Sequence, residues 1–162
     1  MKDAWPLPQV RATQRLGEAL ARSCPWSERA ARVLYLSGEL GAGKTTLAAA
    51  LLHELGVNEP VRSPSYALLE LYPIGERSAA HIDLYRLNAP DELEQLGLRD
   101  YLNAQTLLLI EWPERGAGVL PPADLQLHLQ TQPERRASFS APSDAGRQWL
   151  ASLEHQLTEV EN

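Results

Sequence analysis

Residues 38–45 constrain the fold of this chain more than any other stretch, because they read Gly-Glu-Leu-Gly-Ala-Gly-Lys-Thr. The spacing G-x-x-x-x-G-K-T is the Walker A or P-loop pattern, in which backbone N–H groups surround a phosphate. The apolar, β-prone residues 33–36 precede the loop, and the helix-forming residues 46–55 follow it, up to Gly56. Strand, loop and helix agree, which favours a phosphate site at a helix N-terminus over an ordinary glycine-rich turn.

The end of the loop carries the side chains with the most specific expected roles. Lys44 is predicted to reach the β- and γ-phosphates of a nucleotide, and the Thr45 hydroxyl is predicted to hold Mg²⁺. Lysine occurs only at positions 2 and 44. Because no lysine follows Lys44, the Asn/Thr-Lys-x-Asp segment of guanine-specific P-loop proteins is absent, which favours ATP. The candidate nucleotide-binding residues are Glu39, Leu40, Gly41, Ala42, Gly43, Lys44, Thr45, Thr46, Thr13, Trp112 and Arg135.

Composition fits one globular domain over residues 1–162, with 44% hydrophobic and 22% charged residues. No apolar run approaches the ~20 residues of a membrane span, and the first residues lack a signal-peptide core, so we expect a cytoplasmic protein. Residues 1–60 carry a net charge of +1 and residues 61–162 carry −7. The acidic second part argues against strong independent binding of nucleic acid. It suits either docking onto a basic protein surface or a solvated acidic face.

The rest of the pattern predicts an α/β fold. The unbroken apolar run 106–111 is typical of a central parallel strand buried on both faces. Alternation over 66–72 and 79–85, around a turn at 73–77, predicts an antiparallel hairpin. We expect a P-loop NTPase-like single domain with a mixed, mostly parallel sheet flanked by helices. The other expected elements are an extended arm over 1–9, a helix over 14–23 capped by Thr13, helix character at most over 27–32, a helix over 89–96 capped by Asn88, a short turn over 98–102, paired strands over 124–130 and 135–141, and a helix over 144–160.

Two carboxylates end β-type runs and are the candidate acids of a Mg²⁺–nucleotide site. Glu111 ends the run 106–111, and Asp83 ends a less apolar one. The carboxyl ends of parallel strands lie at the same sheet edge as a P-loop, so we take both residues as candidate catalytic and metal-linked groups. Asp83 reads equally well as an ordinary strand-end carboxylate. The segment Ser63-Pro64-Ser65-Tyr66 is either a nucleotide-sensing switch or a proline turn with capping serines.

Four further residues have alternative readings. Trp112 follows Glu111. It is expected either to lie near the nucleotide or to be an ordinary half-buried aromatic residue. Arg135 and Arg136 offer one guanidinium to a phosphate or adenine, or both are exposed surface residues. His81 is expected to pack or hydrogen-bond within the hairpin rather than to act as a base.

The chain resembles the bacterial TsaE family, also called YjeE. The resemblance covers nearly the full length and rests on the segments LPQVRATQRLGEALA, LSGELGAGKTTLAAALLHELG, VRSPSYALLELY, HIDLYRL, DELEQLGLRDYL and LIEWPERG. HIDLYRL and IEWPE after a P-loop are the specific elements, since a P-loop alone identifies no family. One departure is Ser65, where the family usually has threonine; the hydroxyl is kept.

The resemblance implies a small ATPase required for making threonylcarbamoyladenosine in tRNA. It implies two partners, TsaB and TsaD, of which TsaD transfers the threonylcarbamoyl group to the adenosine beside the anticodon. ATP hydrolysis would support repeated turnover of that pair, and tRNA would be reached only through the complex. The residues to which the resemblance gives roles are Lys44 and Thr45 for phosphate and Mg²⁺, Glu111 and Asp83 as essential acids, Trp112 near the nucleotide, and residues 63–66 as a switch.

Two other functions stay open on the sequence. A small-molecule kinase predicts an arginine-rich lid, but the longest candidate lid, residues 112–122, holds only Arg115. A regulatory module with negligible catalysis has the same P-loop, because a partner protein sometimes completes such a site. Measuring ATP hydrolysis with and without partners separates these functions.

Overall fold

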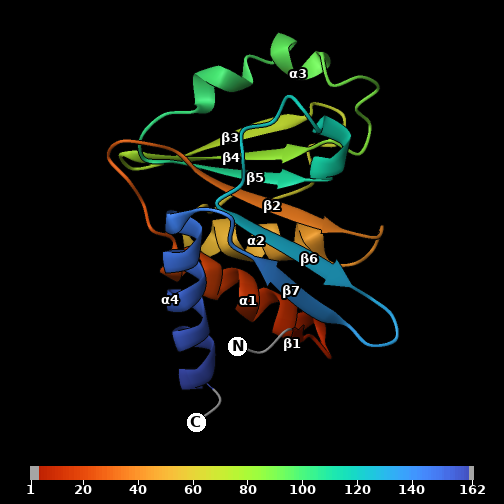
Figure 1. The fold of residues 1–162 in the computed structure, drawn as a ribbon, viewed down its shortest axis with the longest axis vertical. Coiled ribbons are helices and arrows are strands. Elements are labelled where there is room, and N and C mark those ends of the chain that lie inside the picture. The colour runs from red at the N-terminus through yellow and green to blue at the C-terminus, as the bar shows by residue number, and fades with distance from the viewer. Residues whose placement is uncertain (1–3, 161–162) are drawn as a thin grey trace.

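The computed structural model describes residues 4–160, which form one seven-stranded sheet with helices on both faces (Figure 1). The strand order is β1-β7-β6-β2-β5-β4-β3. The four central strands, β6 to β4 in this order, are parallel, and antiparallel strands flank them on both edges. The predicted mixed α/β sheet with a hairpin is confirmed. The strands are β1 (Trp5–Pro6), β2 (Arg32–Gly38), β3 (Leu69–Ile74), β4 (Arg77–Asp83), β5 (Thr106–Glu111), β6 (Leu125–Gln130) and β7 (Arg136–Ser140).

Strand β5 has the bounds that its apolar run predicts, and all six of its residues are buried. It lies between β2 and β4, and its side chains alternate between two cores. Leu107 and Leu109 face the core beneath α1 (Val10–Ser23), α2 (Lys44–Glu54) and α4 (Asp144–Val160). Leu108 and Ile110 face the core covered by α3 (Glu92–Gln95) and the 3₁₀ turn η1 (Leu98–Tyr101). The second 3₁₀ turn, η2, spans Pro113–Gly116.

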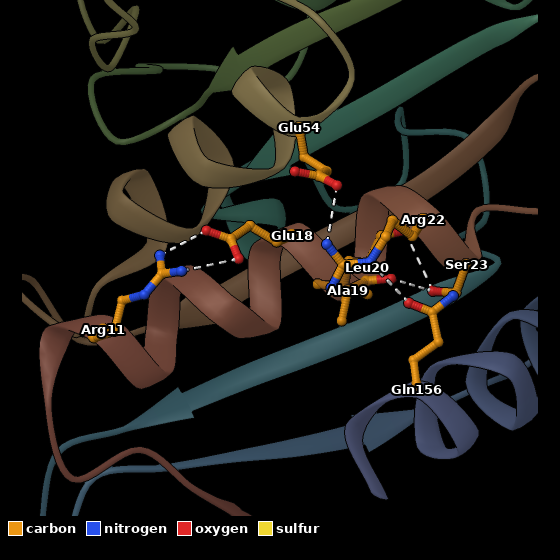
Figure 2. Close-up of polar contacts among 8 residues, drawn as sticks. All are labelled: Arg11, Glu18, Ala19, Leu20, Arg22, Ser23, Glu54 and Gln156. Atoms are coloured by element: carbon orange, nitrogen blue, oxygen red, sulfur yellow. Dashed lines mark hydrogen bonds and ion pairs between the residues drawn. The ribbon is translucent and has the colours of Figure 1, made fainter. Parts of the chain in front are cut away.

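Helix α1 lies directly against α2. A Cβ placed on Gly17 would lie 2.4 Å from the carbonyl oxygen of Leu47, so only glycine permits this approach. Figure 2 shows the polar rim of the contact: Arg22 of α1 donates to Glu54 of α2 at 2.9 Å and to Gln156 of α4 at 3.2 Å. The close seating of α1 fixes one side of the P-loop that begins α2.

The prediction that Thr13 caps the first helix is wrong. Helix α1 already begins at Val10, with Gln9 at the N-cap position and no side-chain cap. Thr13 is buried inside the helix, and its methyl carbon would lie 3.4 Å from a Cβ placed on Gly43. Packing against the P-loop outweighs the capping preference of threonine at this position.

The hairpin is shifted along the chain from its predicted place. The N–H of Leu68 (φ 67°) donates to the Pro64 carbonyl at 2.7 Å, so the preceding residues form a turn instead of a strand. Strand β3 instead continues through Pro73, which the sequence placed in a turn. Proline is tolerated there because β3 is an edge strand that pairs only with β4. Strand β4 ends at Asp83 rather than at Tyr85.

Two helix predictions fail for local reasons. The helix expected over 89–96 is the single turn α3, and Asn88 does not cap it. Instead, the Glu92 carboxylate accepts hydrogen bonds from the backbone N–H groups of Asn88 and Ala89, at 3.2 and 3.1 Å. Residues 28–30 form a bend, no residue of 27–31 is helical, and Arg32 begins β2.

Candidate functional site

The P-loop connects β2 to α2 through three glycines with positive φ. Gly38, Gly41 and Gly43 have φ angles of 137°, 78° and 106°. A Cβ on Gly38 would lie 2.4 Å from the Leu129 carbonyl oxygen, so this glycine is also needed for close approach to β6. The loop borders a pocket of about 200 Å³ lined by Leu40, Gly41, Gly43, Lys44, Thr45, Thr46 and Glu111.

Lys44 lies inside this loop. Its Nζ donates to the carbonyl oxygens of Gly38 and Glu39, at 2.7 and 2.8 Å, and lies 4.2 Å from the centroid of the Trp112 ring. Burial lowers the pKa of Lys44, and the nearby carboxylates, Glu111 first among them, oppose that shift. The ammonium group is thus held beside the loop by bonds that an anion in the pocket can compete for.

Thr45 and Glu111 bring the loop and the sheet edge together. The Thr45 hydroxyl donates to the Glu111 carboxylate, at 3.0 Å to Oε1 and 3.3 Å to Oε2. Glu111 is 1% exposed and ends β5. A hydroxyl and a carboxylate are hard oxygen ligands of the kind Mg²⁺ prefers, and that ion normally takes its remaining ligands from water and phosphate. The donor chemistry therefore fits Mg²⁺.

Asp83 is the strand neighbour of Glu111, in register on β4. It is buried, and its Oδ1 accepts the backbone N–H of Tyr85 at 2.9 Å. Its Oδ2 accepts the hydroxyl of Ser63. Both predicted acids thus lie at one edge of the sheet, but they contact different segments of the chain.

The predicted switch segment, residues 63–66, meets this edge through its first residue. Pro64 is buried and accepts the N–H of Leu68. Ser65 is part-buried, whereas Tyr66 is 84% exposed. The guanidinium carbon of Arg86 lies 4.2 Å from the centroid of the Tyr66 ring.

The remaining predicted site residues surround the P-loop. Arg135 donates to the carbonyl oxygens of Ala42 and Gly41, at 3.4 and 3.5 Å. Arg136 instead pairs with Glu134 at 2.8 Å, so the structure separates the two arginines that the sequence could not. Thr13 packs from the α1 side. Trp112 has φ 57°, and its ring centroid lies 5.0 Å from that of Tyr85.

His81 reaches the site although the sequence assigned it to hairpin packing. It is completely buried on β4, and its Nε2 lies 2.6 Å from Glu111 Oε2. The contact crosses from β4 to β5, so it is not internal to the hairpin. The one sequence signal was spacing: His81 and Asp83 are two residues apart on a strand and therefore point to the same face.

A second cavity, of about 550 Å³, adjoins the P-loop and shares Thr45 and Thr46 with it. It lies along α1 and α2, with Arg11, Glu18 and Glu54 among its lining residues. Figure 2 shows Arg11 paired with Glu18 on α1, with Arg11 Nη1 2.7 Å from Glu18 Oε1. The same figure shows Glu54, which extends from α2. The phosphate pocket therefore lies next to a larger groove that carries charged side chains.

The strand–loop–helix unit, with a carboxylate ending the neighbouring parallel strand, defines an α/β protein of the P-loop NTPase-like class. The fold is similar to the crystal structure of Bacillus subtilis YdiB, with a TM-score of 0.77 and 26% sequence identity, covering 94% of each chain. Residues 7–138 match the family model described as threonylcarbamoyl adenosine biosynthesis protein TsaE. This chain belongs to the TsaE family, and through it to tRNA threonylcarbamoyladenosine biosynthesis.

Individual relatives agree with the family model. The chain is 46% identical to the tRNA threonylcarbamoyladenosine biosynthesis protein TsaE of Haemophilus influenzae over 122 residues, which is 75% of this chain and 77% of that protein. It is 37% identical to the protein of the same description from Bacillus subtilis over 111 residues, or 67% of this chain and 69% of that protein. Within residues 4–160, no helix has the length and apolar character that crossing a bilayer requires.

Proposed function

We propose that this protein is a cytoplasmic, Mg²⁺-dependent ATPase that supports repeated turnover of a TsaB–TsaD pair in the threonylcarbamoyladenosine modification of tRNA. The observation that carries the proposal is the contact of Thr45, at the start of the P-loop helix, with Glu111, at the end of a buried parallel strand. A hydroxyl and an acid in contact at the start of the P-loop helix are the kind of pair with which P-loop proteins hold a cation, which supports the proposal. We treat residues 1–162 as one domain in this role.

The P-loop residues supply binding and charge stabilisation. Lys44 exchanges its two carbonyl partners for oxygens of the β- and γ-phosphates, and the backbone N–H groups of residues 39–46 surround the phosphates. The Thr45 hydroxyl and the Glu111 carboxylate hold Mg²⁺, which neutralises phosphate charge when it is bound. Thr13 and Arg135 flank the loop, and we assign them to nucleotide binding.

Asp83 and Ser63 form the part of the site that can respond to hydrolysis. In the role proposed here, Asp83 orients a water molecule or the cation's hydration shell, and the Ser63 hydroxyl is drawn from Asp83 toward the γ-phosphate. Trp112 lies against Lys44 and lines the same edge. The exposed Tyr66 then carries the change to the surface, where partners dock.

The test is threonylcarbamoyladenosine formation on tRNA under multiple-turnover conditions, with TsaB, TsaD, the threonylcarbamoyl donor and ATP. We expect more than one product per TsaB–TsaD complex with the unmodified protein, and not with the Lys44→Ala variant. Lys2→Ala, at the only other lysine, is the matched control and should behave like the unmodified protein. Turnover that is equal with both proteins, or absent with both, would reject the proposed role.

ATP consumption in the same reactions separates the two alternatives. A kinase consumes ATP in proportion to an added acceptor, whereas the proposed ATPase releases phosphate without one. A regulatory module supports turnover without consuming ATP. Phosphate release that rises when TsaB and TsaD are added supports the proposed function.

A further inference from the structure

His81 is a buried histidine with one partner. The ring lies in the middle of β4 and is 0% exposed, and its Nε2 contacts Glu111 Oε2 at 2.6 Å. Its Nδ1 is buried and has no hydrogen-bond partner among the described residues. Fully buried polar atoms are nearly always paired, so a histidine kept here only for packing is a poor choice.

The contact engages the carboxylate oxygen of Glu111 that is farther from Thr45. Thr45 donates more closely to Oε1 of Glu111, at 3.0 Å, and His81 contacts Oε2. Since an ionised carboxylate only accepts hydrogen bonds, Nε2 is the donor in the His81 contact with the charged form of Glu111. The two donors together fix the rotation of the carboxylate plane about the end of the Glu111 side chain, a torsion that is otherwise broad.

We propose that His81 is a positioning residue for Glu111: its Nε2–H holds Oε2 so that Oε1 stays directed at Thr45 and at a divalent cation bound there. Groups that orient a metal-binding side chain from behind commonly affect metal affinity by about 10- to 100-fold. The inference rests on the proposed function, because it assigns His81 a role only if Glu111 serves a cation. It concerns the cation and not the phosphates, which the loop binds separately.

Two substitutions separate positioning from packing. His81→Leu removes the Nε2–H donor and fills the same space with an apolar side chain of similar volume. His81→Gln places an amide N–H near the position of Nε2 and should restore the contact. Leu109→Val is the matched control, because Leu109 is the buried strand neighbour of His81 on β5 and contributes no hydrogen bond to Glu111.

The measurement is calorimetric binding of a non-hydrolysable ATP analogue, with and without Mg²⁺. We expect His81→Leu to reduce the gain in affinity that Mg²⁺ provides by about tenfold or more, and to change the Mg²⁺-free affinity less than twofold. His81→Gln should recover most of the gain, and Leu109→Val should retain all of it. An unchanged Mg²⁺ gain in His81→Leu, or equal losses with and without Mg²⁺, would overturn the inference.

Imidazole nitrogen NMR of the unmodified protein tests the contact without nucleotide, metal or substitution. The long-range ¹H–¹⁵N spectrum should show His81 protonated at Nε2 with Nδ1 bare. A proton on Nδ1 alone would overturn the inference, since Nε2 would then have nothing to donate. If the unmodified protein gains no affinity from Mg²⁺, the proposed function fails along with the inference. If the unmodified protein gains affinity from Mg²⁺ and His81→Leu gains as much, the inference alone fails.

Discussion

Asp83 and Glu111 lie side by side at the carboxyl ends of β4 and β5, yet Asp83 accepts a hydroxyl from the loop before β3 while Glu111 accepts one from the P-loop helix. The two acids therefore have separable tasks in the function proposed here. In that function, Glu111 binds the cation, and Asp83 holds the segment that is expected to move. Substitutions at the two positions should then differ in kind as well as in size.

Replacing Glu111 with glutamine should weaken the Mg²⁺ dependence of nucleotide binding by about tenfold or more. The amide keeps the shape of the side chain but removes the charge that attracts the cation, and a buried charge acts through little screening solvent. Glu114→Gln is the matched control, because Glu114 is a nearby exposed acid. Titration calorimetry over a range of Mg²⁺ concentrations measures the effect. An equal loss in both variants would point to general charge, and would remove Glu111 as the specific ligand.

Replacing Ser63 with alanine should loosen the segment between residues 61 and 68. A hydrogen bond to a charged acceptor contributes about 1.5–3 kcal/mol, so backbone amides of this segment should exchange with solvent about tenfold faster or more. Ser65→Ala provides the comparison, since no hydrogen bond from Ser65 to Asp83 is found. Hydrogen–deuterium exchange by mass spectrometry reads out both variants. Identical exchange in the two would mean that the Ser63–Asp83 contact does not hold the segment.

Replacing Gly17 with alanine should destabilise the protein despite the better helix propensity of alanine. The propensity gain is about 1 kcal/mol, but the new Cβ would meet the Leu47 carbonyl oxygen at 2.4 Å, and both partners are backbone-anchored. Overpacking of this kind costs about 1–3 kcal/mol, so the net change should lower the free energy of unfolding. Urea titration measures it. A rise in the midpoint would show that α1 moves off α2 at little cost.

The stability of the folded protein should fall in alkali partly because of Cys24. Burial raises the pKa of this thiol from 9.0 to about 12. Between these two pH values the thiol is therefore protonated in the folded chain and deprotonated in the unfolded chain. Stability from this group is complete below about pH 9 and is lost as pH rises toward about 12, by roughly 1 kcal/mol per pH unit. The difference in unfolding free energy between the unmodified protein and Cys24→Ala isolates the effect. A difference that does not vary with pH would contradict it.

The sequence pattern was sufficient to predict those elements whose structure depends mainly on their own residues. Strand β5 and helix α4 have their predicted bounds, because an unbroken apolar run and a long amphipathic period each leave one solution. The P-loop is equally local, since its glycines match the positive φ angles found there. These elements also bring Glu111 to the loop, which is why the sequence could nominate it.

Features that depend on distant partners were beyond the sequence. The sequence pattern around Thr13 is that of a helix cap, and only the fold brings Thr13 against Gly43. The pattern around His81 is that of a hairpin strand, and only the pairing of β4 with β5 brings His81 to Glu111. The division of Arg135 and Arg136 between the P-loop and Glu134 likewise follows from where β7 begins. The length of α3 was overestimated because the residues before it make i→i+3 turn bonds, such as Leu93 N–H to the Pro90 carbonyl at 3.1 Å, instead of a continuous α-helical ladder.

Pro73 has a consequence for how these molecules meet one another. An edge strand offers unpaired backbone groups on which a further strand can assemble, and proline, having no N–H, interrupts that row. At the opposite edge, β1 is only Trp5–Pro6, so it too ends in proline and presents little to extend. Because β1 covers only Arg136 and Ala137 of β7, strand-to-strand contact is less restricted at that edge, whereas Pro73 should hinder it at the β3 edge in a crowded cell.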